Sequence, residues 1–209
     1  MKPTIQFGDY MNTENTNKYR KYSFKTPLKK LILAQFGAAM LGIMTSMPTV
    51  TLASAGRTLD IATSLLAIGF LLYLQYTSLW DIGARDRISV DGGRLREDKL
   101  IGLKSALLAN IPTYGLAVLC IIFKSVHLLT NAGWIGSAFN ITYAIELMWN
   151  YMYHGLLVFF VPGSVGSWLN IPYLATFILF TAPSLITCLV AYRMGLSGKR
   201  IFPVRKKYN

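Results

Sequence analysis

Charged side chains are concentrated in one short part of this chain, positions 80–104, which hold six basic and five acidic residues. Carboxylates spaced this closely are able to act as a general acid and base, or to hold guanidinium groups in fixed rotamers. The two histidines, His127 and His154, lie outside this stretch, and the topology derived below puts both on the opposite side of a membrane. We therefore expect no catalytic activity.

Acidic and basic residues alternate along the stretch, so each base has an acid within reach. The aspartates predicted to orient the basic side chains are Asp81, Asp86, Asp91 and Asp98. An arginine held by a carboxylate presents a planar, pre-oriented fork of donors to a phosphate. The alternative is a solvated loop whose exposed ion pairs contribute at most about 1 kcal/mol each. The sequence leaves both interpretations open.

Five apolar segments surround the charged stretch and must position it: 31–53, 61–80, 105–123, 141–161 and 172–192. Each is close to the roughly 20 residues that a helix needs to cross a bilayer. Charged residues make up 14% of the chain, against about 25% in soluble proteins. Both cysteines, Cys120 and Cys188, lie inside apolar segments, so we expect no disulfide, metal site or cofactor. The chain is predicted to be an all-α integral membrane protein.

Basic residues predict the topology. The N-terminal tail, 1–30, holds seven basic and two acidic residues, and the C-terminal tail, 193–209, holds six basic residues and no acid. Basic residues beside membrane segments stay in the cytoplasm, so both tails and the 81–104 loop are predicted to be cytoplasmic, flanking a membrane domain at 31–192. The N-terminal tail has no apolar core, so we expect no signal peptide. Because both tails are predicted to lie on the same side of the membrane, the chain should cross the membrane an even number of times.

An even number of crossings requires that one apolar segment does not span, and 141–161 is the best candidate. Glu146, Asn150 and His154 recur at four-residue spacing and so share one helical face. Tryptophans and tyrosines around them are typical of a membrane interface. We expect four transmembrane helices plus an interfacial or re-entrant helix at 141–161. The alternative is a full span whose polar stripe faces the interior of the bundle.

Two further features predict local helix geometry. Ala34, Ala38 and Gly42 repeat at four-residue spacing, which favours close approach of another backbone. Pro48 and Pro112 are expected to kink or end their helices, because proline lacks an amide hydrogen. Both features are compatible with ordinary packing of a helical bundle.

A net charge of +12 favours a polyanionic partner, either anionic membrane lipid or nucleic acid. Tyrosines that alternate with basic residues in the tails favour RNA, because aromatic rings stack on unpaired bases beside cations that meet phosphates. The predicted RNA contacts are Lys18, Arg20, Lys21, Lys25, Lys29, Lys30, Arg85, Arg87, Arg94, Arg96, Lys99, Lys104, Lys199, Arg200, Arg205, Lys206 and Lys207.

The charged stretch also carries the pattern W-D-x-G-x-R-D-R, followed by G-R and then by E-D-K-x-x-G-L-K. With the basic tails and several apolar segments, this pattern resembles the bacterial membrane proteins that associate with the ornate, large, extremophilic (OLE) RNA. The resemblance covers positions 80–112 and implies a homodimer that holds a long structured noncoding RNA at the inner face of the cell membrane. The residues that it carries over are Asp81, Arg85, Asp86, Arg87, Gly93, Arg94, Asp98 and Lys104.

The sequence thus predicts a multi-pass protein of the cell membrane that anchors a large structured RNA at the cytoplasmic face and also contacts anionic lipids. The alternative is a membrane subunit of a multi-component transporter, in which the 81–104 loop docks a cytoplasmic ATPase or another partner. RNA that copurifies with the solubilised protein would separate these two hypotheses.

Overall fold

The computed structural model describes residues 22–51, 56–160, 176 and 178–199, and every described element is helical. The elements are α2 (Lys25–Thr51), α3 (Gly56–Asp91), α4 (Ile101–Ala109), α5 (Ile111–Thr130), α6 (Gly133–Trp149), the 3-10 turn η1 (Tyr151–Tyr153), α7 (His154–Phe160) and α9 (Ala182–Ser197). No strand occurs within these residues, so the prediction of an all-α chain is confirmed for them.

Three helical stretches are long and apolar enough to cross a membrane: Lys25–Thr45, Thr58–Asp91 and Ile111–Thr130. They belong to three of the four predicted spans. Of the fourth, 172–192, residues 172–175 and 177 lie outside the described residues, and α9 covers its second half. α3 has 36 residues and therefore extends about 54 Å, well beyond a hydrocarbon core of about 30 Å.

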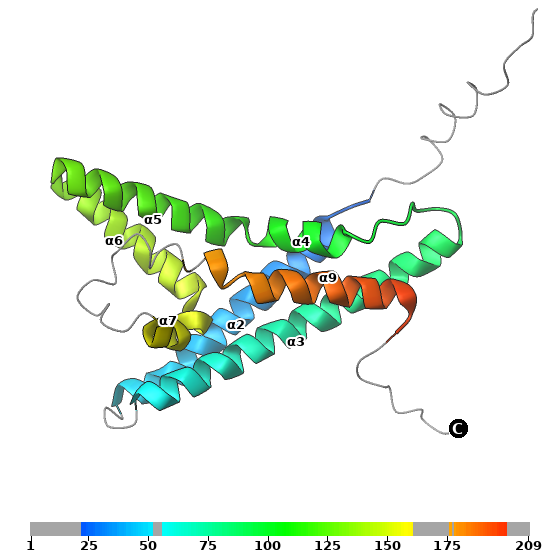
Figure 1. Ribbon diagram of the computed structural model, residues 1–209, viewed down its shortest axis with the longest axis horizontal. Coiled ribbons are helices and arrows are strands. Elements are labelled where there is room, and N and C mark those ends of the chain that lie inside the picture. The colour runs from blue at the N-terminus through cyan, green and yellow to red at the C-terminus, as the bar shows by residue number, and fades with distance from the viewer. Residues whose placement is uncertain (1–21, 52–55, 161–175, 177, 200–209) are drawn as a thin grey trace, which may run out of the picture.

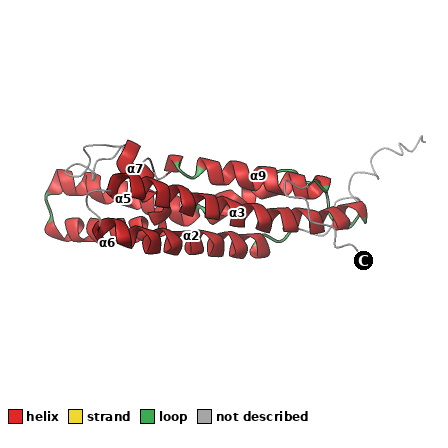
Figure 2. Cartoon of the chain, turned by 90° about the horizontal axis from the view of Figure 1, so that it is seen from below, coloured by secondary structure: helices red, strands yellow, loops and turns green. Residues whose placement is uncertain are grey.

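The helices run broadly along the long axis of the molecule in stacked layers (Figure 2). α3 packs against α2 on one side and against the length of α9 on another, and α9 also covers α4. The start of α2, the ends of α3 and α9 and the start of α4 consequently meet at one end (Figure 1). We call this end, formed by residues 22–30, 81–104 and 193–199, the charged end.

Small residues set the closest helix crossings. A Cβ added at Gly195 would lie 2.9 Å from Ala84 N, and one at Gly83 would lie 2.5 Å from Tyr192 O. On α2, Ala38 is fully buried, and a Cβ at Gly42 would lie 3.0 Å from the Met152 backbone. The close approach predicted for the small-residue row of α2 is therefore confirmed.

Much of the charged stretch is helical, whereas the sequence predicts a loop. α3 continues through it to Asp91, because no proline interrupts the chain there and Gly83, the one glycine between Trp80 and Asp91, stays helical where it packs against α9. Gly93, with φ of 65°, then reverses the chain direction, and α4 begins only at Ile101. The irregular part of the predicted 81–104 loop is thus limited to 92–100.

The third predicted span is broken near Pro112, as expected, whereas α2 does not end at Pro48 but continues to Thr51. α4 ends at Ala109 and α5 starts at Ile111, with Asn110 between them. The Asn110 side chain donates a hydrogen bond to Ala106 O at 2.8 Å, which satisfies a carbonyl near the break. The two helices therefore form one interrupted element.

The predicted helix at 141–161 is also interrupted. α6 starts earlier, at Gly133, and ends at Trp149, after which η1 and α7 change the direction of the chain. Because Asn150 lies at this break, His154 does not continue the helical face of Glu146. Glu146 and Asn150 are fully buried, so these two side chains match the alternative of a polar stripe that faces the bundle interior.

Candidate functional site

Asp81 joins the first two helices at the charged end. Its Oδ2 atom accepts the Lys30 ammonium of α2 at 3.2 Å and the Arg85 guanidinium, one turn along α3, at 3.0 Å. All three side chains are partly exposed, so each ion pair contributes at most about 1 kcal/mol. Asp81 therefore orients Arg85 but partly neutralises it.

The sequence predicts that Asp86 orients a basic side chain, but its partners in the structure are tyrosines. Tyr192 of α9 donates to Asp86 Oδ2 at 2.9 Å, and the Tyr22 side chain lies beside the same carboxylate. Burial, with the neighbouring Asp86 charge, raises the pKa of the Tyr22 hydroxyl above its usual range. No arginine forms an ion pair with Asp86 in the described part of the chain. Asp86 thus connects α3 to α9 and to the residues before α2.

Arg87 and Trp80 fix the end of α9. Arg87 pairs with Asp91 at 3.6 Å, and its guanidinium lies against Gly198, the C-cap of α9. A cation there interacts favourably with the helix dipole. The Trp80 indole donates to Lys199 O at 2.6 Å. The chain after residue 199 therefore leaves from the charged end.

Asp98 orders the connection between α3 and α4. It accepts the Lys104 ammonium at 2.6 Å and the Leu100 backbone amide at 2.9 Å. These hydrogen bonds lower the pKa of the Asp98 carboxyl below its usual value. Because the pKa is lower in the folded state, the resulting stabilisation is present at neutral pH and disappears as the pH falls through that lowered pKa.

A second group of cations at the charged end lacks carboxylate partners among the described residues. These exposed side chains form no ion pair with a carboxylate of the described residues: Lys25, Lys29, Arg94, Arg96 and Arg193. All five belong to the charged end. They remain available to an external anion, whereas Lys30, Arg85, Arg87 and Lys104 already bind carboxylates.

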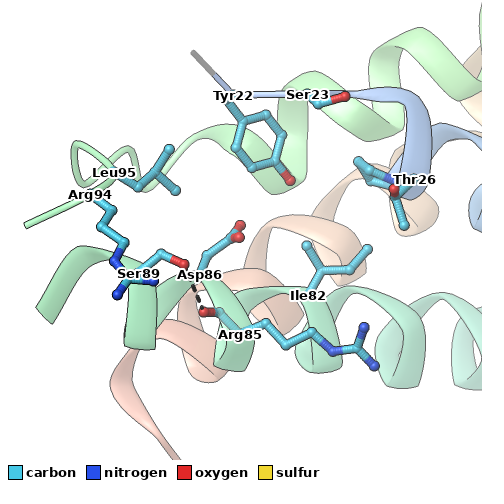
Figure 3. Close-up of a pocket in the computed structure, with 10 residues that line it drawn as sticks. Tyr22, Ser23, Thr26, Ile82, Arg85, Asp86, Ser89, Arg94 and Leu95 are labelled. Carbon is cyan, nitrogen blue, oxygen red and sulfur yellow. Dashed lines mark hydrogen bonds between the residues drawn. The ribbon is translucent and has the colours of Figure 1, made fainter. Parts of the chain in front are cut away.

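Two cavities open at the charged end, and Tyr22 lines both. The first, of about 340 Å³, has Arg85 and Arg94 in its wall, and the second, of about 520 Å³, has Arg96 and Lys104. Figure 3 shows the Asp86 carboxylate pointing toward the Tyr22 hydroxyl, whereas the Arg85 side chain runs away from it. Both cavities that Tyr22 lines thus have cations in their walls.

The interior of the bundle holds a separate polar cluster. Thr113 Oγ1 lies 3.1 Å from Gln35 Nε2 and 3.1 Å from Trp149 Nε1, and accepts a hydrogen bond from each. Nearby in α6, Asn150 Nδ2 donates to Glu146 Oε1 at 2.9 Å. These hydrogen bonds join α2, α5 and α6 inside an apolar environment, where unpaired polar groups are costly.

The structure thus brings together the predicted cations of the first helix, the charged stretch and Lys199. The remaining predicted contacts lie outside the described residues, and they are Lys18, Arg20, Lys21, Arg200, Arg205, Lys206 and Lys207. Sequence reasoning missed the roles of Tyr22 and Tyr192 as partners of Asp86, because a contact between distant segments leaves no local pattern. Groups of three or more His, Cys, Asp or Glu suited to a metal ion do not occur among the described residues.

The charge of the whole chain is distributed very unevenly. Four charged residues lie outside the charged end and the two segments that continue from it, and their charges cancel: Arg57, Asp60, Lys124 and Glu146. The entire net charge of +12 therefore belongs to the charged end and the tails attached to it.

Comparison of the chain with protein-family models, curated proteins and solved structures finds no match.

Proposed function

We propose that this chain is a membrane protein that binds RNA with its charged end and so holds the RNA at the cytoplasmic face of the membrane. The observation that carries the proposal is that all of the net charge of +12 lies at this end and in its two tails. Phosphate neutralisation by such a surface releases counterions, which supplies most of the free energy of RNA binding without sequence recognition.

The length of α3 favours RNA over lipid as the partner of Arg94. The apolar segment of α3 ends at Trp80, and Ser89 lies about 13 Å farther along the helix axis. Arg94 is beside Ser89, since its backbone amide donates to Ser89 O at 2.9 Å. A headgroup layer is only about 5–8 Å thick, so a helix near the membrane normal carries Arg94 beyond it.

The arrangement of side chains also supports recognition beyond simple attraction. Arg94 and Arg96 are exposed cations beside the two cavities that share Tyr22. Exposed cations next to concave surfaces favour a folded RNA, whose phosphates are held at defined positions, over a flexible strand. The OLE-associated membrane proteins, which the charged stretch resembles, suggest a large structured RNA as the partner.

The same proposal includes the topology. We place the charged end in the cytoplasm, with α2, α3, the interrupted α4–α5 element and the segment that ends in α9 as four crossings. α6, η1 and α7 then form a re-entrant element that packs its polar residues Glu146 and Asn150 inside the bundle.

The direct test is to crosslink RNA in cells, purify the detergent-solubilised protein and sequence the attached RNA. We expect one structured RNA to be strongly enriched, and we expect Arg94→Gln with Arg96→Gln to reduce its recovery at least about tenfold. The matched control is Arg57→Gln with Lys124→Gln, which removes the same charge away from the charged end and should leave recovery unchanged. Recovery of an ATPase without enriched RNA would support the transporter alternative instead.

A further inference from the structure

A groove on the outer surface of α2 lies apart from the RNA-binding cavities. It has a volume of about 550 Å³, with Lys25 and Lys29 at one end and walls that include Leu33, Phe36 and Trp149. The α2 residues lie at positions three or four apart, so they form one stripe along the helix. This stripe is cationic at the charged end and apolar farther into the membrane.

The Trp149 side chain, which forms one wall of the groove, is held in place by a hydrogen bond inside the bundle. Its indole N–H donates to Thr113 Oγ1 at 3.1 Å inside the bundle, so its polar atom is satisfied. The groove is therefore lined by apolar side-chain surface at this point, without an unpaired donor. Leu33 and Phe36 are 66% and 51% exposed, and both lie in a stretch suited to crossing the membrane. The apolar part of the groove consequently faces the bilayer.

The two lysines lack a carboxylate partner among the residues that the structure describes. Neither Lys25 nor Lys29 forms an ion pair with a described carboxylate, and both are exposed. The distance along the helix axis from Lys25 to Phe36 is about 16 Å, which matches a headgroup followed by the upper part of an acyl chain. An amphiphile with an anionic head can bind the lysines through its head and the apolar wall of the groove through its chain.

We propose that this groove binds one anionic phospholipid, with its phosphate at Lys25 and Lys29 and an acyl chain along Leu33, Phe36 and Trp149. A second copy of the chain fits less well. Copies with the same membrane orientation, related by a two-fold axis along the membrane normal, would bring the lysines of both protomers to the same depth and near one another. Such like charges repel in the absence of an anion.

The proposal is tested by native mass spectrometry of the full-length protein, delipidated in detergent and titrated with phosphatidylglycerol or phosphatidylcholine of identical chains. We expect one phosphatidylglycerol to bind with a preference of roughly thirtyfold, and Lys25→Gln with Lys29→Gln to abolish that preference. Equal affinity for the two lipids would overturn the proposal.

A groove-filling variant separates this site from the RNA-binding surface. Leu33→Trp changes no charge and, at an exposed position, leaves the buried core intact; it should reduce phosphatidylglycerol binding at least about tenfold while RNA recovery stays unchanged. Ile122→Trp, at a 48% exposed position on α5, is the matched control and should bind lipid normally. Retained lipid binding in Leu33→Trp, or conversion of a dimer to a monomer without loss of lipid, would contradict the lipid assignment.

Discussion

At the scale of single residues, the charged end contains two kinds of charged group with different roles. Asp81 and Asp86 connect helices through partners on other segments, and Asp98 orders the connection between α3 and α4 through Leu100 and Lys104. Arg94 and Arg96 form no ion pair with the described residues. Substitutions in the first kind should change stability, whereas substitutions in the second should change binding.

Asp86→Asn tests the first kind. The carboxylate accepts a hydrogen bond from Tyr192, and a bond to a charged acceptor contributes about 1.5–3 kcal/mol. We expect the substitution to lower the free energy of unfolding in detergent by about 2 kcal/mol. Asp91→Asn, at a side chain that is 69% exposed, is the control and should cost less than about 1 kcal/mol. Equal effects of the two substitutions would rule out a connecting role for Asp86.

Thr113→Val tests the buried polar cluster. The substitution keeps the side-chain shape but removes the acceptor shared by Gln35 and Trp149. Because both donors would then be unpaired inside the bundle, we expect a loss of about 1–2 kcal/mol in thermal or denaturant unfolding. Thr77→Val is the control, since among the described residues Thr77 Oγ1 bonds to carbonyls of its own helix alone, and it should be nearly neutral. A neutral Thr113→Val would show that these donors find other acceptors.

At the scale of elements, the crossing of α3 and α9 determines how the charged end is assembled. The two helices approach closely at Gly83 and Gly195. Just after this crossing, Trp80 and Arg87 contact the C-terminal end of α9. Gly195→Ala would place a methyl group against the Gly83 and Ala84 backbone, so we expect a loss of about 1–3 kcal/mol in stability.

The same substitution should also weaken RNA binding, because α9 carries Arg193 and leads into the basic C-terminal tail. Gly69→Ala is the matched control, since nothing lies within 4 Å of a Cβ added there. It should leave RNA binding unchanged and should not lower stability, because alanine favours a helix over glycine. A Gly195→Ala protein as stable as Gly69→Ala would contradict the close crossing.

The sequence predicted those elements whose signals are local. Apolar length located the three candidate spans, and the spacing of Ala34, Ala38 and Gly42 located a real helix contact. The extension of α3 to Asp91 was missed because mixed charges suggested a loop, although the spacing of Arg87 and Asp91 also suits one helical turn. The break at Asn150 has no glycine or proline to mark it, and it depends on packing against α2 and α3.

At the site, composition predicted which residues are basic but not which of them are free. Arg85 and Arg87 differ from Arg94 and Arg96 because they pair with Asp81 and Asp91 one turn away, a pairing that requires α3 to extend to Asp91. The contact between Asp86 and Tyr192 joins positions 106 residues apart, which no local spacing reveals. The extent of α3 and its tertiary contacts therefore decide which part of the predicted surface is available to a partner.

At the scale of the whole molecule, topology follows from the one-sided charge. The native cysteines are fully buried, so cysteines introduced at Arg94 and at Thr130, near the two ends of the molecule, report accessibility with little background. We expect a membrane-impermeant maleimide to label Arg94→Cys only in inverted vesicles and Thr130→Cys only in intact cells. Labelling of both from the same side would contradict the proposed crossings.

The central claim is that RNA is bound through phosphate contacts at the charged end, and the salt dependence of affinity measures those contacts directly. If about six to ten cations meet phosphates, log K should fall against log salt concentration with a slope of about −5 to −8. Arg94→Gln with Arg96→Gln should reduce the magnitude of this slope by about 1.5, whereas Arg57→Gln with Lys124→Gln should not change it. A nearly flat salt dependence of the wild-type protein, or the same loss of slope in both double variants, would contradict RNA binding by the charged end.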